Sequence, residues 1–371
     1  MKMKYQAYSD LLRRMVRIPS PSYGEAEVCA LLSGFLDDIG IAHEVQRGNI
    51  VAVNKHFDPT KKTLAIDAHM DTVLPADGYA RDPYDPGNED GVIYGLGSND
   101  DGGSVVSMTA AFRHFYDMDL PANLMLILSV EEERSGPDGT SWLFAEDGFF
   151  AGHGKYPVPD WVIVGEPTGM KAATSERGLI VIDGTAHGVA GHAARGDGEN
   201  ALYKALDDIA ALRAHRFGRI SPVMGEVKLN VTMIEAGKAH NVIPDLCRFV
   251  VDIRTTEQYT APEILSELQA ICKSVLKARN LDNRSSATYP DSPLLGTASA
   301  LGIECFSSPT TSDWMRINGD AIKMGPGMSS RSHKADEYIL TDEIYEAIDT
   351  YIRFIEKFFY GNTLEQRFLR H

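Results

Sequence analysis

The sequence predicts an α/β domain that is interrupted by a smaller α+β domain. Apolar strand-like segments alternate with helix-like segments up to about residue 175, and this alternation resumes after residue 290. Between these limits the pattern changes, and over residues 176–190 the apolar residues recur with a period of two, which is typical of strands with one exposed face. We therefore expect one domain formed by residues 1–175 and 290–371, with residues 176–289 inserted as a second domain.

Each element of the first domain is predicted from its apolar spacing. Helical spacing predicts helices over residues 8–18, 25–40, 101–116, 138–150 and 340–359. Continuous apolar runs predict strands over residues 62–69, 123–133, 160–167 and 321–327. Strands without an exposed face are typical of parallel or mixed sheets that helices cover on both sides.

The inserted domain has its own order of elements. We expect, in sequence, a strand, a helix, two strands, a helix and a last strand, over residues 176–190, 200–216, 226–237, 247–255, 261–279 and 284–290. This βαββαβ order is the ferredoxin-like arrangement. Its sheet has an open edge, and pairing that edge with a second copy predicts a homodimer with twofold symmetry.

Composition excludes several classes of protein. The chain has 371 residues and a formal net charge of -16, which argues against sequence-independent binding to nucleic acids. Its four cysteines are widely spaced without a CxxC pair, so neither a zinc–thiolate site nor a disulfide framework is expected, and a reducing cytoplasm is the expected location. We expect no signal peptide and no membrane span, because no apolar run is long enough.

The segment DAHMDTV (67–73) follows an apolar strand and carries His69 and Asp71. Residues two apart in a strand project to the same side, so both side chains leave the carboxyl end of that strand together. Open α/β sheets form their sites at this end. The alternative is a strand end that happens to carry polar residues.

Four further segments place metal-ligand residue types at comparable positions. SNDDGG puts Asp100 directly before a helix, SVEEER ends a strand in three glutamates, VIVGEP ends another in Glu166, and SRSHKADEY carries His333. Each has an ordinary alternative: a helix N-cap for Asp100, a solvated turn for the glutamates, a plain strand end, and a surface histidine. Together they favour a common site, because the carboxyl ends of parallel strands meet at one edge.

The expected ligands are two histidines and several carboxylates, without cysteine. This set suits Zn²⁺, with Co²⁺ or Mn²⁺ as alternatives. It exceeds the three protein ligands of a single catalytic zinc ion and suffices for two metals that share a carboxylate.

These motifs resemble the family of di-zinc metallopeptidases and amidohydrolases that includes acetylornithine deacetylase, succinyl-diaminopimelate desuccinylase and glutamate carboxypeptidase. The resemblance covers essentially the whole chain and implies roles for individual residues. It implies a bridging Asp100, a general base in Glu132, and an orienting partner of one ligand in Asp71. The implied metal ligands are His69, Asp100, Glu133, Glu166 and His333.

The segments GLGSNDDGGSVVS, GHAARGDGENA and GPGMSSRSH are most similar to the acetylornithine-deacetylase-like branch. The resemblance implies hydrolysis of an N-acyl amino acid, such as N-acetylornithine, N-acetylcitrulline or an N-succinyl analogue, in arginine biosynthesis. Glu132 would take a proton from water and pass it to the leaving amine. An exopeptidase and a non-catalytic binding protein remain alternatives. One departure is Gly102, where many members have lysine.

The resemblance also implies residues in the inserted domain. His192, in the segment GHAARG, would reach into the partner subunit's active site and stabilise the oxyanion, although a surface loop histidine is the alternative. Arg177, Arg254 and Asn241 are the candidates for binding the substrate. Arginine suits this role because its planar guanidinium binds a carboxylate through two hydrogen bonds, and ordinary surface pairing is the alternative.

Overall fold

The structure is a computed structural model that describes residues 2–153 and 155–361. The chain forms two compact units. One comprises Met1–Thr174, Thr288–Phe306 and Ser312–His371, and the other comprises Ser175–Ala287 and Ser307–Thr311. The insertion was expected over residues 176–289, and the structure adds the short segment Ser307–Thr311 to it.

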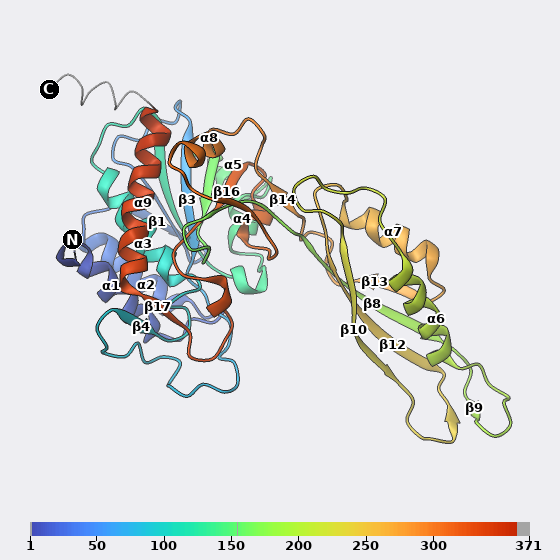
Figure 1. The fold of residues 1–371 in the computed structure, drawn as a ribbon. Helices are drawn as coiled ribbons and strands as arrows, with labels where there is room; N and C mark the ends of the chain where they lie inside the picture. The colour runs from blue at the N-terminus through green and yellow to red at the C-terminus, as the bar shows by residue number, and fades with distance from the viewer. Residues whose placement is uncertain (1, 154, 362–371) are drawn as a thin grey trace. The chain divides into compact units, whose positions relative to one another are not determined.

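A mixed sheet forms the centre of the first unit, with the described strands in the order β1-β2-β5-β3-β6-β16-β7-β14 and with β15 paired to β7 (Figure 1). These strands are β1 (His43–Gln46), β2 (Asn49–Val53), β3 (Thr63–His69), β5 (Asn123–Ser129), β6 (Trp161–Val164), β7 (Ala172–Glu176), β14 (Ser286–Ala287), β15 (Cys305–Ser308) and β16 (Asp320–Lys323). Strand β3 pairs in parallel with β5 and β6, and β6 pairs in parallel with β16. Four carboxyl ends therefore meet at one edge.

Helices cover both faces of this sheet, as its apolar strands require. On one face, Leu64 and Ile66 pack in a core with the helices α1 (Lys2–Val16), α2 (Ala26–Asp38), α3 (Gly102–Phe115), α8 (Pro293–Ala300) and α9 (Thr341–Tyr360). On the other face, Ala65 and Met125 pack with α4 (Thr140–Leu143), α5 (Phe149–His153) and the 3-10 helix η2 (Asp313–Arg316). The remaining described elements are β4 (Val92–Tyr94), η1 (Glu132–Arg134), η3 (Ser329–Arg331) and β17 (Tyr338–Leu340), and β4 pairs with β17.

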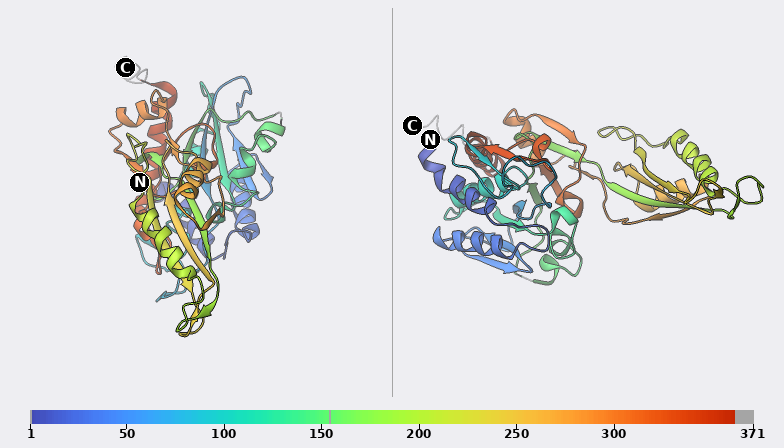
Figure 2. Two further views of the ribbon diagram at one scale, coloured as in Figure 1. Left: turned by 90° about the vertical axis from the view of Figure 1, so that its right-hand side faces the viewer. Right: turned by 90° about the horizontal axis from the view of Figure 1, so that it is seen from below.

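The second unit is a four-stranded antiparallel sheet in the order β10-β12-β8-β13, with two helices on one face (Figure 2). Its elements are β8 (Leu179–His187), α6 (Ala201–Ala214), β10 (Lys228–Ala236), β12 (Leu246–Arg254), α7 (Ala261–Ile271) and β13 (Val275–Ala278). Alternate residues of β8 are buried, and Ile180 and Ile182 pack with Ile264 and Leu268 of α7. A short ribbon of β9 (Gly191–His192) and β11 (Val242–Ile243) lies apart from this sheet. The ferredoxin-like order of elements is therefore present.

Three predicted elements differ from the structure, namely the helices over residues 138–150 and 261–279 and the strand over residues 284–290. The helix over 138–150 is two short helices, α4 and α5, because the chain turns at Gly148, where an added Cβ would lie 1.8 Å from the carbonyl oxygen of Trp142. The helix over 261–279 ends at Ile271, and the last strand of the inserted sheet is β13 rather than residues 284–290. In β13 only Leu276 is buried between exposed neighbours, which is a strand pattern too short to recognise.

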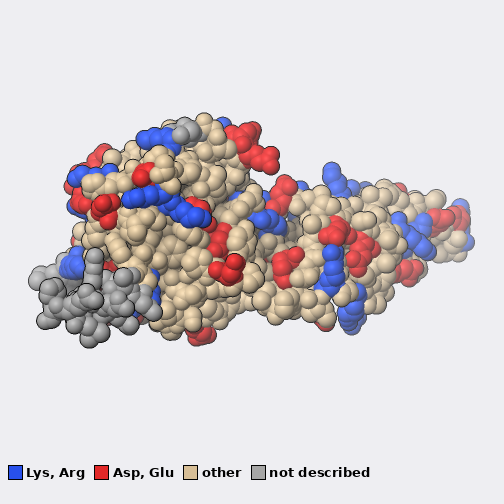
Figure 3. Space-filling view, turned by 90° about the horizontal axis from the view of Figure 1, so that it is seen from above, with Lys and Arg blue, Asp and Glu red and all other residues tan. Residues whose placement is uncertain are grey.

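Three further expectations concern membrane spans, surface charge and the cysteines. No helix within the described residues is both long and apolar enough to span a membrane. On the face shown in Figure 3, lysines and arginines are interspersed with aspartates and glutamates. The four cysteines are free, and all but Cys305 are buried.

Candidate metal centre

His69 and Asp71 leave the carboxyl end of β3 as a linked pair. The Nδ1 atom of His69 lies 3.0 Å from the carbonyl oxygen and 3.3 Å from Oδ1 of Asp71, and both side chains are buried. Burial lowers the pKa of His69, but its contacts with Asp100 and Asp71 outweigh this and raise the pKa well above its ordinary value. Nδ1 is therefore engaged by Asp71, which leaves Nε2 to face the site.

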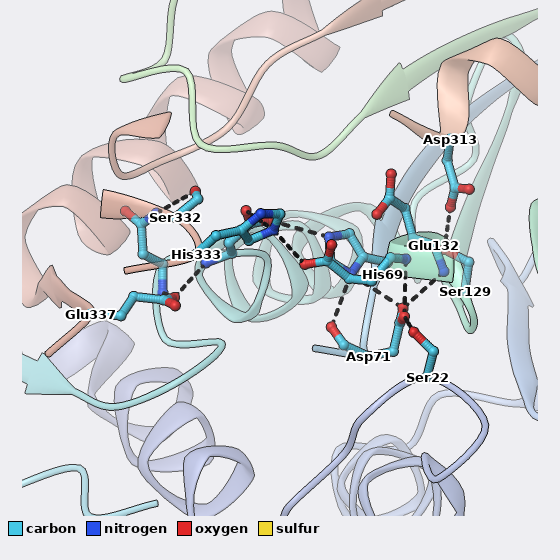
Figure 4. A network of polar contacts seen from close by, with 12 residues as sticks. Ser22, His69, Asp71, Ser129, Glu132, Asp313, Ser332, His333 and Glu337 are labelled. Atoms are coloured by element: carbon cyan, nitrogen blue, oxygen red, sulfur yellow. Dashed lines mark hydrogen bonds and ion pairs between the residues drawn. The ribbon is translucent and has the colours of Figure 1, made fainter. Parts of the chain in front are cut away.

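Asp71 also holds the loop that carries the glutamates. Its Oδ1 accepts a hydrogen bond from the backbone N–H of Glu132 (3.0 Å), and its Oδ2 accepts from that of Glu133 (3.1 Å) and from the hydroxyl of Ser22 (2.7 Å; Figure 4). Burial raises the pKa of Asp71, but the bonds from His69 and these donors lower it below its ordinary value. One buried carboxylate thus fixes both His69 and the glutamate loop.

Asp100 lies between the two histidines. Its Oδ1 is 3.3 Å from Nε2 of His69, and its Oδ2 is 3.8 Å from Nε2 of His333. The N-cap of α3 is Asp101, whose side chain makes no capping hydrogen bond, so the alternative of Asp100 as a helix cap is wrong. A carboxylate whose two oxygens face different imidazoles is placed to bind two cations.

The glutamates occupy a tight turn after β5. Glu131 has a left-handed backbone (φ 63°), and η1 follows it. The Glu133 side chain is only 8% exposed, and its Oε1 lies 2.9 Å from Nε2 of His333, so it does not belong to a solvated turn. Burial raises the pKa of Glu132 well above its ordinary value, and the nearby charge of Glu166 adds to this rise.

Glu166 follows β6 and completes the cluster. Burial, and then the charge of Asp100, raise its pKa well above the ordinary value, whereas the buried Lys323 of β16 opposes the shift. The site contains two groups of three residues, and within each group the potential ligand atoms all lie within 4.8 Å of one another. They are His69 with Glu132 and Glu166, and His69 with Asp100 and Glu133.

The donor set fits divalent metal ions. Several carboxylates lie within a few ångströms of one another in a buried place, and such an arrangement requires compensating positive charge. The predicted ligands His69, Asp100, Glu133 and Glu166 belong to these two groups, and Nε2 of His333 lies 2.9 Å from Oε1 of Glu133. Glu132, predicted as a base, lies as close to His69 and Glu166 as a ligand would.

Several contributing residues were not foreseen from the sequence. Asp313 of η2 accepts hydrogen bonds from Ser129 (3.0 Å) and Thr140 (2.6 Å), and burial raises its pKa to about 6. Glu337, buried beside Asp100, has its pKa raised by burial to about 8. Glu337 lies four residues after His333 in the segment SHKADEY, and this proximity was the one available signal.

Gly102 is the departure from the pattern that the resemblance implies, and the structure gives a steric reason for its small size. A Cβ at this position would lie 2.4 Å from the carbonyl oxygen of Gly97 and 2.5 Å from a methyl carbon of Leu12. The start of α3 therefore has no room for a side chain here.

The four residues of the inserted unit that were predicted to act on the substrate lie in different surroundings. The Arg177 guanidinium is buried and donates to the carbonyl oxygens of Met224 and Glu226. Arg254 forms a two-bond ion pair with Asp252 of the same strand. His192 and Asn241 come together on the β9–β11 ribbon, where the N–H of Ala193 donates to the carbonyl oxygen of Asn241. The roles of these four residues stay predictions.

The parallel strand ends and the donor set define an α/β protein with a candidate metal centre. The model of Peptidase family M20/M25/M40 matches residues 65–357, and the chain belongs to this family. It is therefore a hydrolase of the M20 family.

Known relatives match nearly the full length. The chain is 28% identical to a succinyl-diaminopimelate desuccinylase of Stenotrophomonas maltophilia, covering 95% of this chain and 99% of that protein. It is 29% identical to an acetylornithine deacetylase of Myxococcus xanthus, covering 84% and 83%. Among solved structures, a dinuclear metal-binding peptidase of Bacillus subtilis superposes with a TM-score of 0.71 at 15% identity, covering 96% and 98%.

Proposed function

We propose that this protein hydrolyses the N-acyl amide bond of an amino acid with the help of two divalent metal ions. The observation that carries the proposal is the placement of Asp100, whose two oxygens face Nε2 of His69 and Nε2 of His333. His69, Asp100 and Glu166 would hold one ion, and Asp100, Glu133 and His333 the other. Zn²⁺ suits this set best, with Co²⁺ or Mn²⁺ as alternatives. When bound, two such ions lower the pKa of water and polarise a carbonyl group.

Glu132 is the proposed general base. Burial raises the pKa of its carboxyl well above the ordinary value, which brings it closer to the range in which one group can both take and return a proton. It would take the proton from the attacking water and pass it to the amine that leaves. Asp71 supports this role, because it holds the backbone N–H of Glu132 and orients His69 at the same time.

The names of the relatives support an N-acyl amino acid as the substrate. One is a desuccinylase and another a deacetylase, so the acyl group is proposed as acetyl or succinyl, on ornithine or citrulline, as in arginine biosynthesis. Arg254, Asn241 and Arg177 are the proposed residues for substrate recognition. A small-peptide exopeptidase is the second candidate, favoured by the peptidase among the similar solved structures. The free cysteines support a cytoplasmic location.

A substrate panel tests the proposal. The protein saturated with Zn²⁺ is incubated separately with N-acetylornithine, N-acetylcitrulline, N-succinylornithine and a set of dipeptides, and the products are measured by mass spectrometry. We expect release of the free amino acid from at least one N-acyl compound. Cleavage of dipeptides alone would favour the exopeptidase, and no turnover of any compound would favour the non-catalytic binding protein.

We further propose a homodimer in which His192 acts in the partner's active site. Strand β10 is an edge of the inserted sheet, and its Met233 and Ile234 are 64% and 48% exposed. Exposed apolar residues on an open edge favour pairing with a second copy. Homodimers of His192→Ala and of Glu132→Ala are each expected to be nearly inactive, whereas mixed dimers should regain up to half of the wild-type activity. If native mass spectrometry confirms subunit exchange but activity stays absent, His192 does not act in the partner's site.

A further inference from the structure

Glu337 joins two segments that carry metal-ligand residues. Its side chain is buried, and its Oε1 accepts hydrogen bonds from the backbone N–H groups of Asn99 (2.8 Å) and Asp100 (3.0 Å). Its own carbonyl oxygen accepts from the N–H of Gly95 (2.8 Å). The loop that carries His333 is thereby bonded to the backbone of the central carboxylate, Asp100.

Asn99 makes the reciprocal connection. Its Nδ2 donates to the carbonyl oxygen of Met328 (3.1 Å) and to the hydroxyl of Ser332 (3.2 Å). Its Oδ1 accepts from the N–H of Met328 (2.9 Å). We name these hydrogen bonds of Asn99 and Glu337, which link residues 95–100 to residues 328–337, the Asn99–Glu337 clasp.

His333 lies between the two arms of this clasp. Ser332, directly before it, is bound by Asn99, and Glu337, four residues after it, is bound to the backbone at residues 99 and 100 (Figure 4). The backbone of His333 is left-handed (φ 59°), as is that of Asp336 (φ 57°), a conformation that is unfavourable for residues other than glycine. The His333 side chain is 55% exposed, so packing alone does not hold it. The conformation therefore depends on the bonds at either side.

We propose that Glu337 and Asn99 are positioning residues that set the spacing between Asp100 and His333, and thereby the affinity of the metal ion these two residues share. The inference rests on the two-metal centre of the proposed function. It assigns to both residues an effect on metal affinity, greatest for the ion that Asp100 and His333 share, which a contribution to folding alone would not produce.

The inserted unit offers a matched control. Asp208 is also a buried carboxylate that accepts from two successive backbone N–H groups, those of Lys273 (2.9 Å) and Ser274 (2.7 Å). Replacing Asp208 removes the same kind of interaction but changes no segment that carries a proposed metal ligand.

The experiment titrates the metal-free protein with Zn²⁺ against a chromophoric chelator, in the wild type, Glu337→Ala, Glu337→Gln, Asn99→Ala and Asp208→Ala. Loss of a residue that orients a metal ligand typically weakens metal binding by about 10–100-fold. We expect this loss for the ion that Asp100 and His333 share, and a smaller loss for the other ion, in Glu337→Ala and in Asn99→Ala. Glu337→Gln keeps an oxygen acceptor for both N–H groups and should approach the wild type, while Asp208→Ala should bind both ions normally. Thermal unfolding of each metal-free variant shows that it is folded.

Each outcome bears on the inference. Unchanged affinity in folded Glu337→Ala, or equal weakening in Asp208→Ala, overturns it. A wild-type protein that binds fewer than two ions overturns both the inference and the two-metal centre. Because no substrate is present, failure of every N-acyl compound in the substrate panel leaves this result unaffected.

Discussion

Replacement of Asp100 by asparagine is the most informative single substitution. Asparagine keeps the shape of the side chain and removes its charge. The two oxygens of Asp100 lie 3.3 Å and 3.8 Å from the two histidine Nε2 atoms, so the lost charge faces both proposed metal positions. We expect Asp100→Asn to lower the affinity for both ions together.

The expected effect is large. At an effective dielectric constant of about 20, two divalent ions roughly 4 Å apart repel by about 17 kcal/mol, and one unit negative charge about 4 Å from each recovers a comparable amount. Loss of this charge should weaken both ions by more than about 10²-fold, above the usual effect of a group that only orients a ligand. A simple helix cap would instead cost about 1 kcal/mol of stability and leave metal binding intact.

The assay is a Zn²⁺ titration of metal-free protein, with the metal content checked by mass spectrometry. Asp101→Asn is the matched control, because Asp101 is the adjacent aspartate, is also buried, and belongs to neither group of potential ligand atoms found among the described residues. Retention of one ion at wild-type affinity in Asp100→Asn would refute the bridging role.

Three further predictions follow from the site. Glu132→Gln should keep both ions but lower kcat by about 10²–10⁴-fold, and loss of one ion with a proportionate loss of activity would instead make Glu132 a ligand. Gly102→Lys should destabilise the protein by about 1–3 kcal/mol, measured by denaturant unfolding, because the new side chain would collide with Gly97 and Leu12. The control Gly34→Ala in α2 should not destabilise it, because nothing lies within 4 Å of the added Cβ. A stable and more active Gly102→Lys would contradict this prediction. Metal-free protein should lose stability as pH rises from about 6.5 to 9. The hydrogen bond to Glu133 raises the pKa of His333 to about 9, and burial raises that of Glu337 to about 8, so the folded state holds more protons than the unfolded state in this interval. Thermal unfolding in EDTA measures this, and a transition temperature that rises with pH would contradict it.

His69, Glu133 and Glu166 could be placed near one sheet edge from the sequence because each ends or follows an apolar strand, whereas Asp100 precedes a helix and His333 lies in a loop. β3, β5 and β6 are continuous apolar runs, and polar residues directly after such runs lie at the sheet edge. Glu132 and Glu133 lie farther beyond the end of their strand than His69 and Glu166 do. Strand β5 ends at Ser129, and they occupy η1 after a left-handed residue. The strand-end pattern therefore predicted that they lie near the site, but it did not predict their backbone conformation.

The supporting residues could not be predicted because they act through contacts distant in sequence. The hydrogen bond from Asp100 to Glu337 joins residues 237 positions apart, and that from Ser129 to Asp313 joins residues 184 positions apart. The sequence around Glu337 and around Asp313 contains no local pattern that predicts their burial. Strand β13 was missed for another reason. The apolar spacing of the preceding helix continues through its four residues, although the helix itself ends at Ile271.

The central claim is that this sheet edge is a two-metal hydrolytic centre. Its most direct test is a stepwise Zn²⁺ titration of the metal-free protein, in which bound metal and release of ornithine from N-acetylornithine or N-succinylornithine are measured together. We predict no turnover without metal, two ions bound per chain at saturation, and full activity only when both are present. Turnover that persists in EDTA, or full activity with a single bound ion, would contradict the claim.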